Sequence, residues 1–229
     1  NISRFPHSCV ARQIKRLILL QGEWFKDEPW LHRLPRSAAT MSEKLQLSAK
    51  YLVAEGAYRK CFRHPDDESL CIKVLHPDTE SGRFRREIRY YSRLQRRGVD
   101  FRHLTPYRGM IDTSLGKGAI FDLVRDDDAR ISRSLHYYRS QNDRQFNAWI
   151  VDEIEHLKQN FYDQWIVFHD LNPTNILVRR LGFDEFRLVV IDGIGDNHFF
   201  PLASYSSTFA RKTLVRVWNR CYRQWYTGF

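Results

Sequence analysis

The feature that most constrains this chain is a short polar loop between apolar segments, followed closely by a second acidic turn. Residues 167–178 read VFHDLNPTNILV, and residues 189–193 read VVIDG. This pattern places Asp170 five residues before Asn175 and puts Asp192 at the end of a strand-like apolar run. Carboxylate and amide groups at such fixed spacing indicate a site that needs oxygen atoms, such as one for a hard metal ion.

Length and composition predict a globular protein with a core of its own. The chain has 229 residues, of which 42% are hydrophobic, and it has no apolar run near the roughly 20 residues that a membrane helix requires. Its first residues lack a secretory pattern, so we expect a cytoplasmic protein. The four cysteines contain no C-x-x-C pair, which predicts neither a zinc site nor a disulfide framework.

Three regions of the chain differ in pattern. Residues 1–40 hold an amphipathic helical pattern and a proline-containing linker, so they are predicted to be a leader or extension of uncertain role. Residues 41–124 have the pattern of short strands around one helix, with Ser81 as its cap and Gly98 as its end. Residues 125–229 are mainly helical in pattern, apart from strands near the polar loop. This order predicts an α+β fold in two lobes.

In chain order, the polar residues match the parts of a phosphoryl-transfer site. Lys73 lies in CIKV, where protein kinases carry the lysine of V-A-I-K, and Glu87 on the next helix is its expected carboxylate partner. The loop keeps the kinase spacing of H-R-D-L-x-x-x-N, so Asp170 is the predicted catalytic base and Asn175 a predicted metal ligand. Asp192 is the second predicted metal ligand. The cofactors that this reading implies are ATP and Mg²⁺.

The phosphate-binding loop is the weakest part of the match. Residues 54–59 retain only Gly56 from the pattern G-x-G-x-x-G. The backbone N–H of Gly56 is therefore the predicted phosphate contact, and Arg59 and Lys60 would share this role.

Each of these residues also has a purely structural reading. Asp170 can be a turn aspartate before Pro173, and Asn175 can be a loop cap. Glu87 can be a solvated helix residue. Asp192 and the glycine after it can form a simple turn dipeptide.

Four segments together resemble a known family. RKCFRHPDDESLCIKV, RREIRYYSRL, NPTNIL and VVIDGIGDNHFFPLASYSS are similar to the PhoP regulatory network proteins, the YrbL-like family. The similarity runs from about residue 41 to the end of the chain. It implies a bilobal protein-kinase-like fold, with a small antiparallel-sheet N-lobe that has one helix and a mainly helical C-lobe. It also implies a Gram-negative bacterial source and a link to magnesium-responsive and envelope-stress regulation.

The sequence departs from ordinary protein kinases near the predicted metal site. Gly193 and Ile194 replace the usual Phe-Gly, Asn172 stands where the catalytic loop normally has a lysine, and no A-P-E segment follows. A small-molecule, sugar or lipopolysaccharide-type hydroxyl acceptor is therefore favoured over a protein. The leading prediction is an ATP- and magnesium-dependent kinase-like phosphotransferase. The alternative is a kinase-like regulatory nucleotide-binding protein with weak or no turnover.

A formal net charge of +10 predicts attraction to polyanions. The helical pattern from about residue 208 onward carries Arg216 and Arg220 on one face, which gives a third reading as a binder of nucleic acid or anionic membrane. A basic face suits a phosphorylated acceptor equally well. We therefore expect nucleotide and an unidentified hydroxyl acceptor as partners, disfavour nucleic acid, and leave open both an anionic character of the acceptor and a peripheral contact with an anionic membrane.

Overall fold

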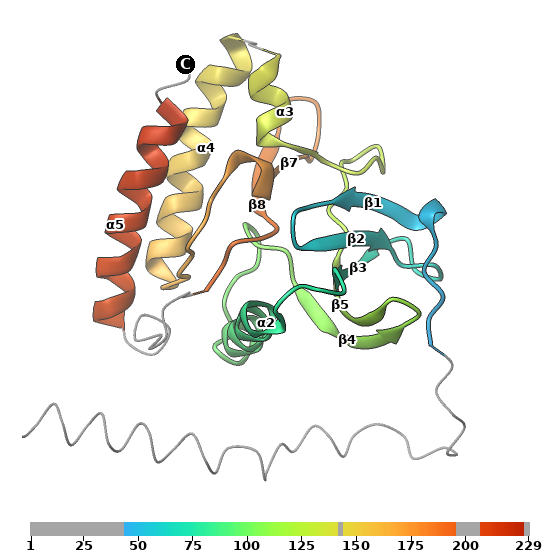
Figure 1. The fold of residues 1–229 in the computed structure, drawn as a ribbon. Coiled ribbons are helices and arrows are strands. Elements are labelled where there is room, and N and C mark those ends of the chain that lie inside the picture. Colours follow the sequence, from blue (N-terminus) through green and yellow to red (C-terminus); the bar gives the residue numbers. More distant parts are fainter. Residues whose placement is uncertain (1–43, 142–143, 196–206, 227–229) are drawn as a thin grey trace, which may run out of the picture. The chain divides into compact units, whose positions relative to one another are not determined.

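A computed structural model describes residues 44–141, 144–195 and 207–226 of the chain (Figure 1). Residues 44–229 form one unit and residues 1–43 another. The predicted leader, residues 1–40, lies outside the described residues, and the predicted boundary between residues 124 and 125 stays a prediction. The described part has two antiparallel sheets and several helices, which confirms the predicted α+β class.

The larger sheet contains five strands in the order β1-β2-β3-β5-β4, and all neighbouring strands are antiparallel. The strands are β1 (Leu52–Glu55), β2 (Arg59–Arg63), β3 (Leu70–Leu75), β4 (Tyr107–Thr113) and β5 (Gly116–Asp122). A 3-10 turn, η1 (Ala49–Tyr51), precedes them. The strands predicted around the Glu-Gly turn and at CIKV are confirmed.

The two faces of β2 and β3 have different chemistry because side chains alternate along a strand. Phe62, Ile72 and Val74 point to one face and form a small buried cluster with Leu47. The alternate residues of the two strands point to the opposite face, and these are Arg59, Cys61, Arg63, Cys71 and Lys73.

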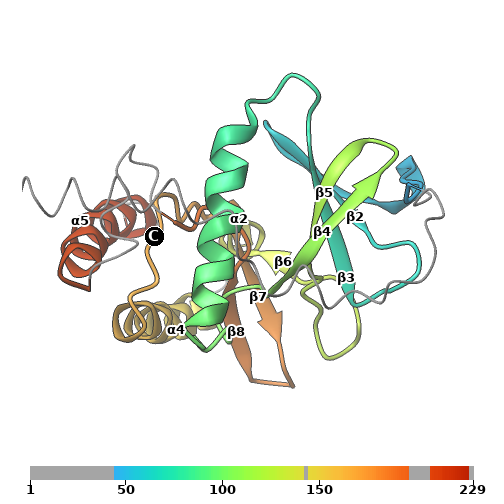
Figure 2. The same cartoon turned by 90° about the horizontal axis from the view of Figure 1, so that it is seen from below.

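Helix α2 (Ser81–Arg96) runs beside the larger sheet (Figure 2). Its apolar residues recur at helical spacing, and the buried Tyr91 packs edge-on against Phe121 of β5, with ring centroids 5.0 Å apart. The predicted end is confirmed, because Gly98 has a φ of +66° and its N–H donates to Gln95. The predicted cap is wrong: the N-cap is Glu80, without a side-chain bond, and the serine is the first helical residue.

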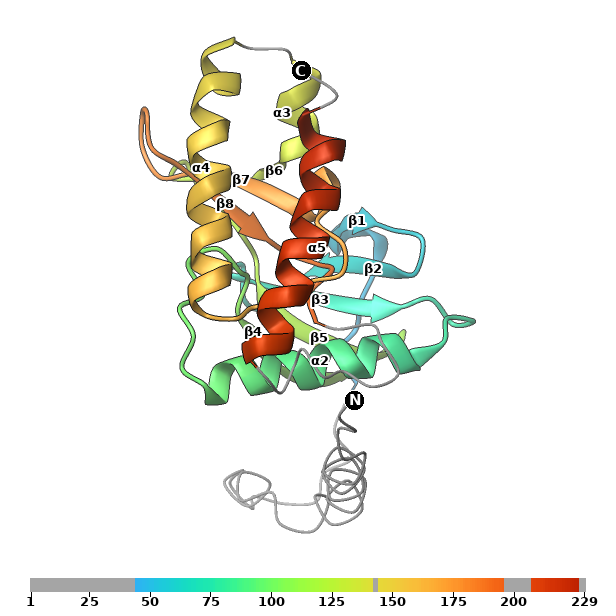
Figure 3. The same ribbon diagram turned by 90° about the vertical axis from the view of Figure 1, so that its left-hand side faces the viewer.

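The smaller sheet has three antiparallel strands, β6 (Arg133–Ser134), β7 (Ile176–Arg180) and β8 (Phe186–Val190), in that order. A 3-10 turn, η2 (Pro173–Asn175), leads into β7. Three helices complete this part: α3 (Leu135–Ser140), α4 (Arg144–Asp163) and α5 (Ser207–Tyr226). Both α4 and α5 lie on the side of β7 and β8 that faces away from the larger sheet (Figures 1 and 3).

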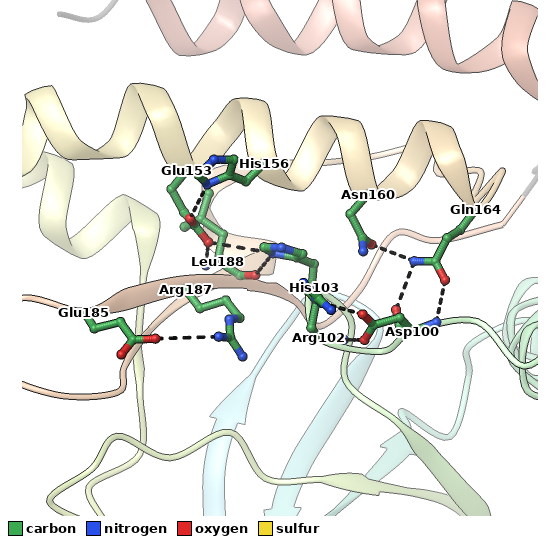
Figure 4. A network of polar contacts seen from close by, with 10 residues as sticks. All are labelled: Asp100, Arg102, His103, Glu153, His156, Asn160, Gln164, Glu185, Arg187 and Leu188. Carbon is green, nitrogen blue, oxygen red and sulfur yellow. Dashed lines mark hydrogen bonds and ion pairs between the residues drawn. The ribbon is translucent and has the colours of Figure 1, made fainter.

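A buried polar network fixes α4, β8 and the segment before β4 to one another (Figure 4). Glu153 accepts a hydrogen bond from the N–H of Leu188 at 3.1 Å, and His103 Nδ1 donates to the carbonyl of Leu188 at 2.9 Å. His103 also accepts from the N–H of Val190 through its own carbonyl, at 2.9 Å. Because both side chains are buried, their hydrogen bonds to the β8 backbone make the position of this strand well defined.

Helix α5 packs through an apolar face on this part of the molecule. Leu214, Trp218 and Cys221 are buried, and the side chain of Trp225 lies outside the described residues. Among the helices that the structure describes, none is long and apolar enough to cross a lipid bilayer.

Candidate functional site

A cleft of about 1130 Å³ lies beside the polar face of β2 and β3. Four of the predicted site residues line this cleft: Gly56, Lys73, Asn175 and Asp192. They come from the larger sheet, from the loop before β7 and from the residues just after β8. The fold therefore brings together residues more than a hundred positions apart.

Lys73 lies on β3, lines the cleft and is only 5% exposed. Its ammonium donates a hydrogen bond to the carbonyl oxygen of Ile191, the residue before Asp192. It also lies 4.5 Å from the centre of the Phe121 ring. Burial lowers the pKa of Lys73, and the nearby Arg59 cation lowers it further.

Arg59 connects two of the predicted acidic site residues. Its guanidinium donates two hydrogen bonds to Glu87, at 2.9 and 3.2 Å, and also binds both carboxylate oxygens of Asp192, with the Nε contact at 3.1 Å. Glu87 is 8% exposed on α2, so this ion pair is largely shielded from water. The planar fork of arginine suits such bidentate contacts.

The direct Lys73–Glu87 ion pair that the sequence predicted is not formed. Arg59 takes the carboxylate, and Lys73 binds a backbone carbonyl instead. The two predicted partners still influence each other, because the negative charge of Glu87 raises the pKa of Lys73 against the larger lowering by burial. The sequence predicted that Arg59 contacts phosphate. Its position on a strand gave no indication that it would bridge two carboxylates.

The loop with Asp170 is held against the residues after β8 by close backbone contact. The N–H groups of His169 and Asp170 both donate to the carbonyl of Gly193, at 2.9 and 3.3 Å, and Gly195 donates to Val167 at 2.7 Å. Gly193 has a φ of +80°, and a Cβ atom there would lie 1.9 Å from the carbonyl oxygen of Asp170. Only glycine permits this approach, which fixes Asp170 beside the residue that follows Asp192.

The side chain of Asp170 is exposed and lies outside the lining of the cleft. One carboxylate oxygen accepts the N–H of Asn172 at 3.1 Å. Arg220 of α5 donates to the carbonyl of His169 at 2.7 Å, so one of the two arginines predicted to form a basic binding face also anchors this loop.

Comparison of the sequence with known proteins identifies the family of this chain. A family model described as "PhoP regulatory network protein YrbL" matches residues 45–226. The chain belongs to the YrbL family. The uncharacterized protein YrbL of Escherichia coli (strain K12) is 32% identical over 179 residues, which is 77% of this chain and 85% of the relative. The uncharacterized protein YrbL of Shigella flexneri matches to the same extent. The family predicted from the sequence is confirmed.

Asn175 and Asp192 lie next to each other in this YrbL-family cleft. The N–H of Ile191 donates to the carbonyl of Asn175 at 2.9 Å, which pairs the start of β7 with the end of β8. An amide oxygen and a carboxylate are suitable donors for Mg²⁺. The described residues contain no group of three or more His, Cys, Asp or Glu side chains that could hold a metal ion by themselves. One amide and one carboxylate are too few ligands for Mg²⁺, so an ion held by Asn175 and Asp192 would need water or substrate phosphates as further ligands.

Gly56 contributes to the wall of the cleft at the turn between β1 and β2. Its N–H donates to the carbonyl of Arg59 at 2.9 Å, and its own carbonyl binds His76 Nε2 at 2.9 Å. The N–H that was predicted to contact phosphate is therefore already used by the turn. Gly56 stays a predicted cofactor-binding residue through its position in the wall.

Proposed function

We propose that this YrbL-family chain is an ATP- and magnesium-dependent kinase-like phosphotransferase whose larger sheet and helical part act as the two lobes of a kinase-like fold. The observation that carries the proposal is the convergence of Lys73, Asn175 and Asp192 on one cleft. Lys73 comes from β3, Asn175 from the turn before β7 and Asp192 from the residues just after β8, and their order along the chain matches the phosphate- and metal-binding positions of kinases.

Each residue of the cleft has a role that follows from its position. Lys73 is a buried residue of the cleft wall and would direct its ammonium at the phosphates of ATP. Asn175 and Asp192 would hold the magnesium ion, which supplies charge neutralisation on the phosphates when bound. Glu87 would orient the basic groups of the larger sheet, since it already holds Arg59 in place.

Asp170 would accept the proton of the acceptor hydroxyl. Its carboxylate is exposed, and its backbone is fixed beside the residue after Asp192, so it is open to an acceptor that approaches from solvent. We favour a small-molecule, sugar or lipopolysaccharide-type acceptor, because the segment after Gly193 lacks the peptide-docking motif of protein kinases. A peripheral contact with an anionic membrane is also part of this proposal.

A thermal unfolding experiment tests nucleotide binding. The full chain is melted with ATP alone, Mg²⁺ alone and both together. A ligand at a hundred times its dissociation constant stabilises the folded state by about 2.7 kcal/mol, which raises Tm by several degrees in a domain of this size. We expect this shift only with both components, and we expect Asp192→Ala to remove it. Asp184→Ala is the matched control, because Asp184 is exposed on the turn between β7 and β8. A wild-type protein without any shift would contradict the proposal.

A second candidate function is nucleotide-dependent regulation without turnover. It is favoured by Asn172, which stands where kinases have a lysine and whose side chain accepts from Thr174 N and Oγ1, at 3.1 and 3.0 Å. These hydrogen bonds cap η2. Because asparagine is uncharged, this position supplies no cation for the transferring phosphate. A screen of metabolites and envelope glycans for transfer of labelled phosphate separates the two functions. Transfer that Asp170→Asn abolishes supports the enzyme, whereas binding without transfer to any acceptor supports regulation.

A further inference from the structure

Two cysteines stand together in the wall of the cleft. Cys61 of β2 pairs in register with Lys73, and Cys71 of β3 pairs with Arg63, so the two cysteines are diagonal neighbours on one face of the sheet. Both line the cleft. Cys61 is partly exposed, whereas Cys71 is 4% exposed, so a small reagent in the cleft would reach Cys61 first.

The surroundings of Cys61 favour its thiolate form. The Cys71 thiol donates a hydrogen bond to the carbonyl of Asp122 at 3.8 Å. Hydrogen bonding from Cys71, with the positive charges of Lys73 and Arg59, lowers the pKa of Cys61 to about 7. The pKa of Cys71 is raised by the same interaction and by burial, so Cys71 stays a protonated donor.

We propose that Cys61 and Cys71 form a peroxide-reactive thiol pair in the wall of the cleft, with Cys61 as the attacking thiol and Cys71 as the resolving thiol. The argument combines the position of both sulfur atoms on one face, the access to Cys61 through the cleft and the two cations beside it. The inference goes beyond the proposed phosphotransfer and does not rest on it.

The chemistry balances with hydrogen peroxide as the oxidant. The Cys61 thiolate attacks one peroxide oxygen, an S–O bond forms, the O–O bond breaks, and the leaving hydroxide takes up a proton to become water. The Cys71 sulfur then attacks the Cys61 sulfur of this sulfenic acid. An S–S bond forms, and the departing hydroxyl leaves as water with the proton of the Cys71 thiol. In total, two thiols lose two electrons and one peroxide is reduced to two waters.

The sheet geometry allows the second step with little movement. Diagonal neighbours in an antiparallel pair have Cα atoms about 7–8 Å apart, and their Cβ atoms are closer. A disulfide needs a Cα separation below about 7 Å. Closing the bond between Cys61 and Cys71 therefore draws β2 slightly along β3, on the side where both strands face the open cleft.

Peptide mass spectrometry of the full chain after peroxide treatment at pH 7 tests this proposal. We expect a Cys61–Cys71 cross-linked peptide as the main product. In the Cys71→Ser variant, the reaction should stop at a Cys61 sulfenic acid, which dimedone traps. In the Cys61→Ser variant, the Cys71 thiol should stay reduced. Cys221 is the internal control, because it is buried and burial raises its pKa. A Cys61 that oxidises no faster than Cys221, or that links to a cysteine other than Cys71, would overturn the proposal.

The pH dependence of alkylation by iodoacetamide is a second test that needs no oxidant. The rate at Cys61 should rise with a midpoint near pH 7. Cys71→Ala should move this midpoint towards the roughly 8.5 of a free cysteine, whereas Cys71→Ser keeps a hydroxyl donor and should retain most of the shift. A midpoint of about 8.5 or above in the wild-type protein would refute the activation of Cys61.

Discussion

Substituting Gly193 by alanine should disturb the contact between the Asp170 loop and the residues after β8. Two separate penalties act at this position. The φ of +80° is unfavourable for any residue with a Cβ atom, and the new Cβ would lie 1.9 Å from the carbonyl oxygen of Asp170. Real Cβ contacts are not shorter than 3.0 Å, so the two backbone segments must separate by about 1 Å.

The magnitude follows from these contacts. The left-handed conformation costs a non-glycine residue about 1–2 kcal/mol. Separation of the segments also weakens the hydrogen bonds from the N–H groups of His169 and Asp170 to the carbonyl of Gly193. Each of these bonds contributes about 1 kcal/mol net. We therefore expect Gly193→Ala to lower the free energy of unfolding by about 3–4 kcal/mol.

Two other glycines serve as matched controls in urea unfolding. Gly98 has a φ of +66°, and a Cβ atom added there would have no other atom within 4 Å, so Gly98→Ala should show the conformational penalty alone, about 1–2 kcal/mol. Gly182 has neither penalty, so Gly182→Ala should change stability by less than about 1 kcal/mol. The readout is the denaturation midpoint at unchanged slope. If Gly193→Ala were no more destabilising than Gly98→Ala, the reasoning about the close approach to Asp170 would fail.

Three further predictions concern the site and the buried network. Arg59→Ala should lower the free energy of unfolding by about 3 kcal/mol, because Glu87 is then left buried without its partner. Arg108→Ala breaks a more exposed ion pair and should cost less than about 1 kcal/mol in the same urea assay. Burial lowers the pKa of His103 in the folded state, so the unfolded chain binds more protons below about pH 6.5, and the free energy of unfolding should fall as the pH drops through that value. His103→Asn should make the free energy of unfolding depend less on pH, as measured by urea unfolding between about pH 5 and 8. ATP with Mg²⁺ should slow the alkylation of Cys61 in the wild-type protein, and a Cys61 that reacts at the same rate with and without nucleotide would count against the proposed function while leaving the thiol pair intact.

The sequence predicted the regular elements well where the apolar pattern was long or the turn chemistry was specific. Helix α2 and strands β7 and β8 were found because burial imposes their periodicity on the sequence. The short elements β6 and α3 were missed, because two strand residues and six helical residues carry too few positions to show a period. The Ser81 cap was predicted from residue type, but the helix begins one residue earlier than a serine cap requires.

The site could be predicted as a set of residues but not as a set of pairings. Lys73, Asn175 and Asp192 follow from motif spacing and all line the cleft, whereas Glu87 and Asp170 are not among its lining residues. The partner of Glu87 does not follow from spacing, because both Arg59 and Lys73 lie on the same face of adjacent strands and compete for one carboxylate. Arginine wins this competition through its bidentate geometry, which depends on side-chain directions that no sequence pattern records.

The pairing of Arg59 with two carboxylates balances the charges beside the cleft in the structure. Arg59 neutralises Asp192 and Glu87 together, while Lys73 is close enough to sense the charge of Glu87. If ATP and Mg²⁺ bind as proposed, Asp192 would hold the metal, and the side of the Arg59 guanidinium that now binds Asp192 would be free to contact a phosphate. Glu87 would keep its two hydrogen bonds from Arg59, so this buried carboxylate would not be left unpaired. Such an exchange replaces one ion pair by another and avoids the desolvation cost that makes broken buried pairs expensive.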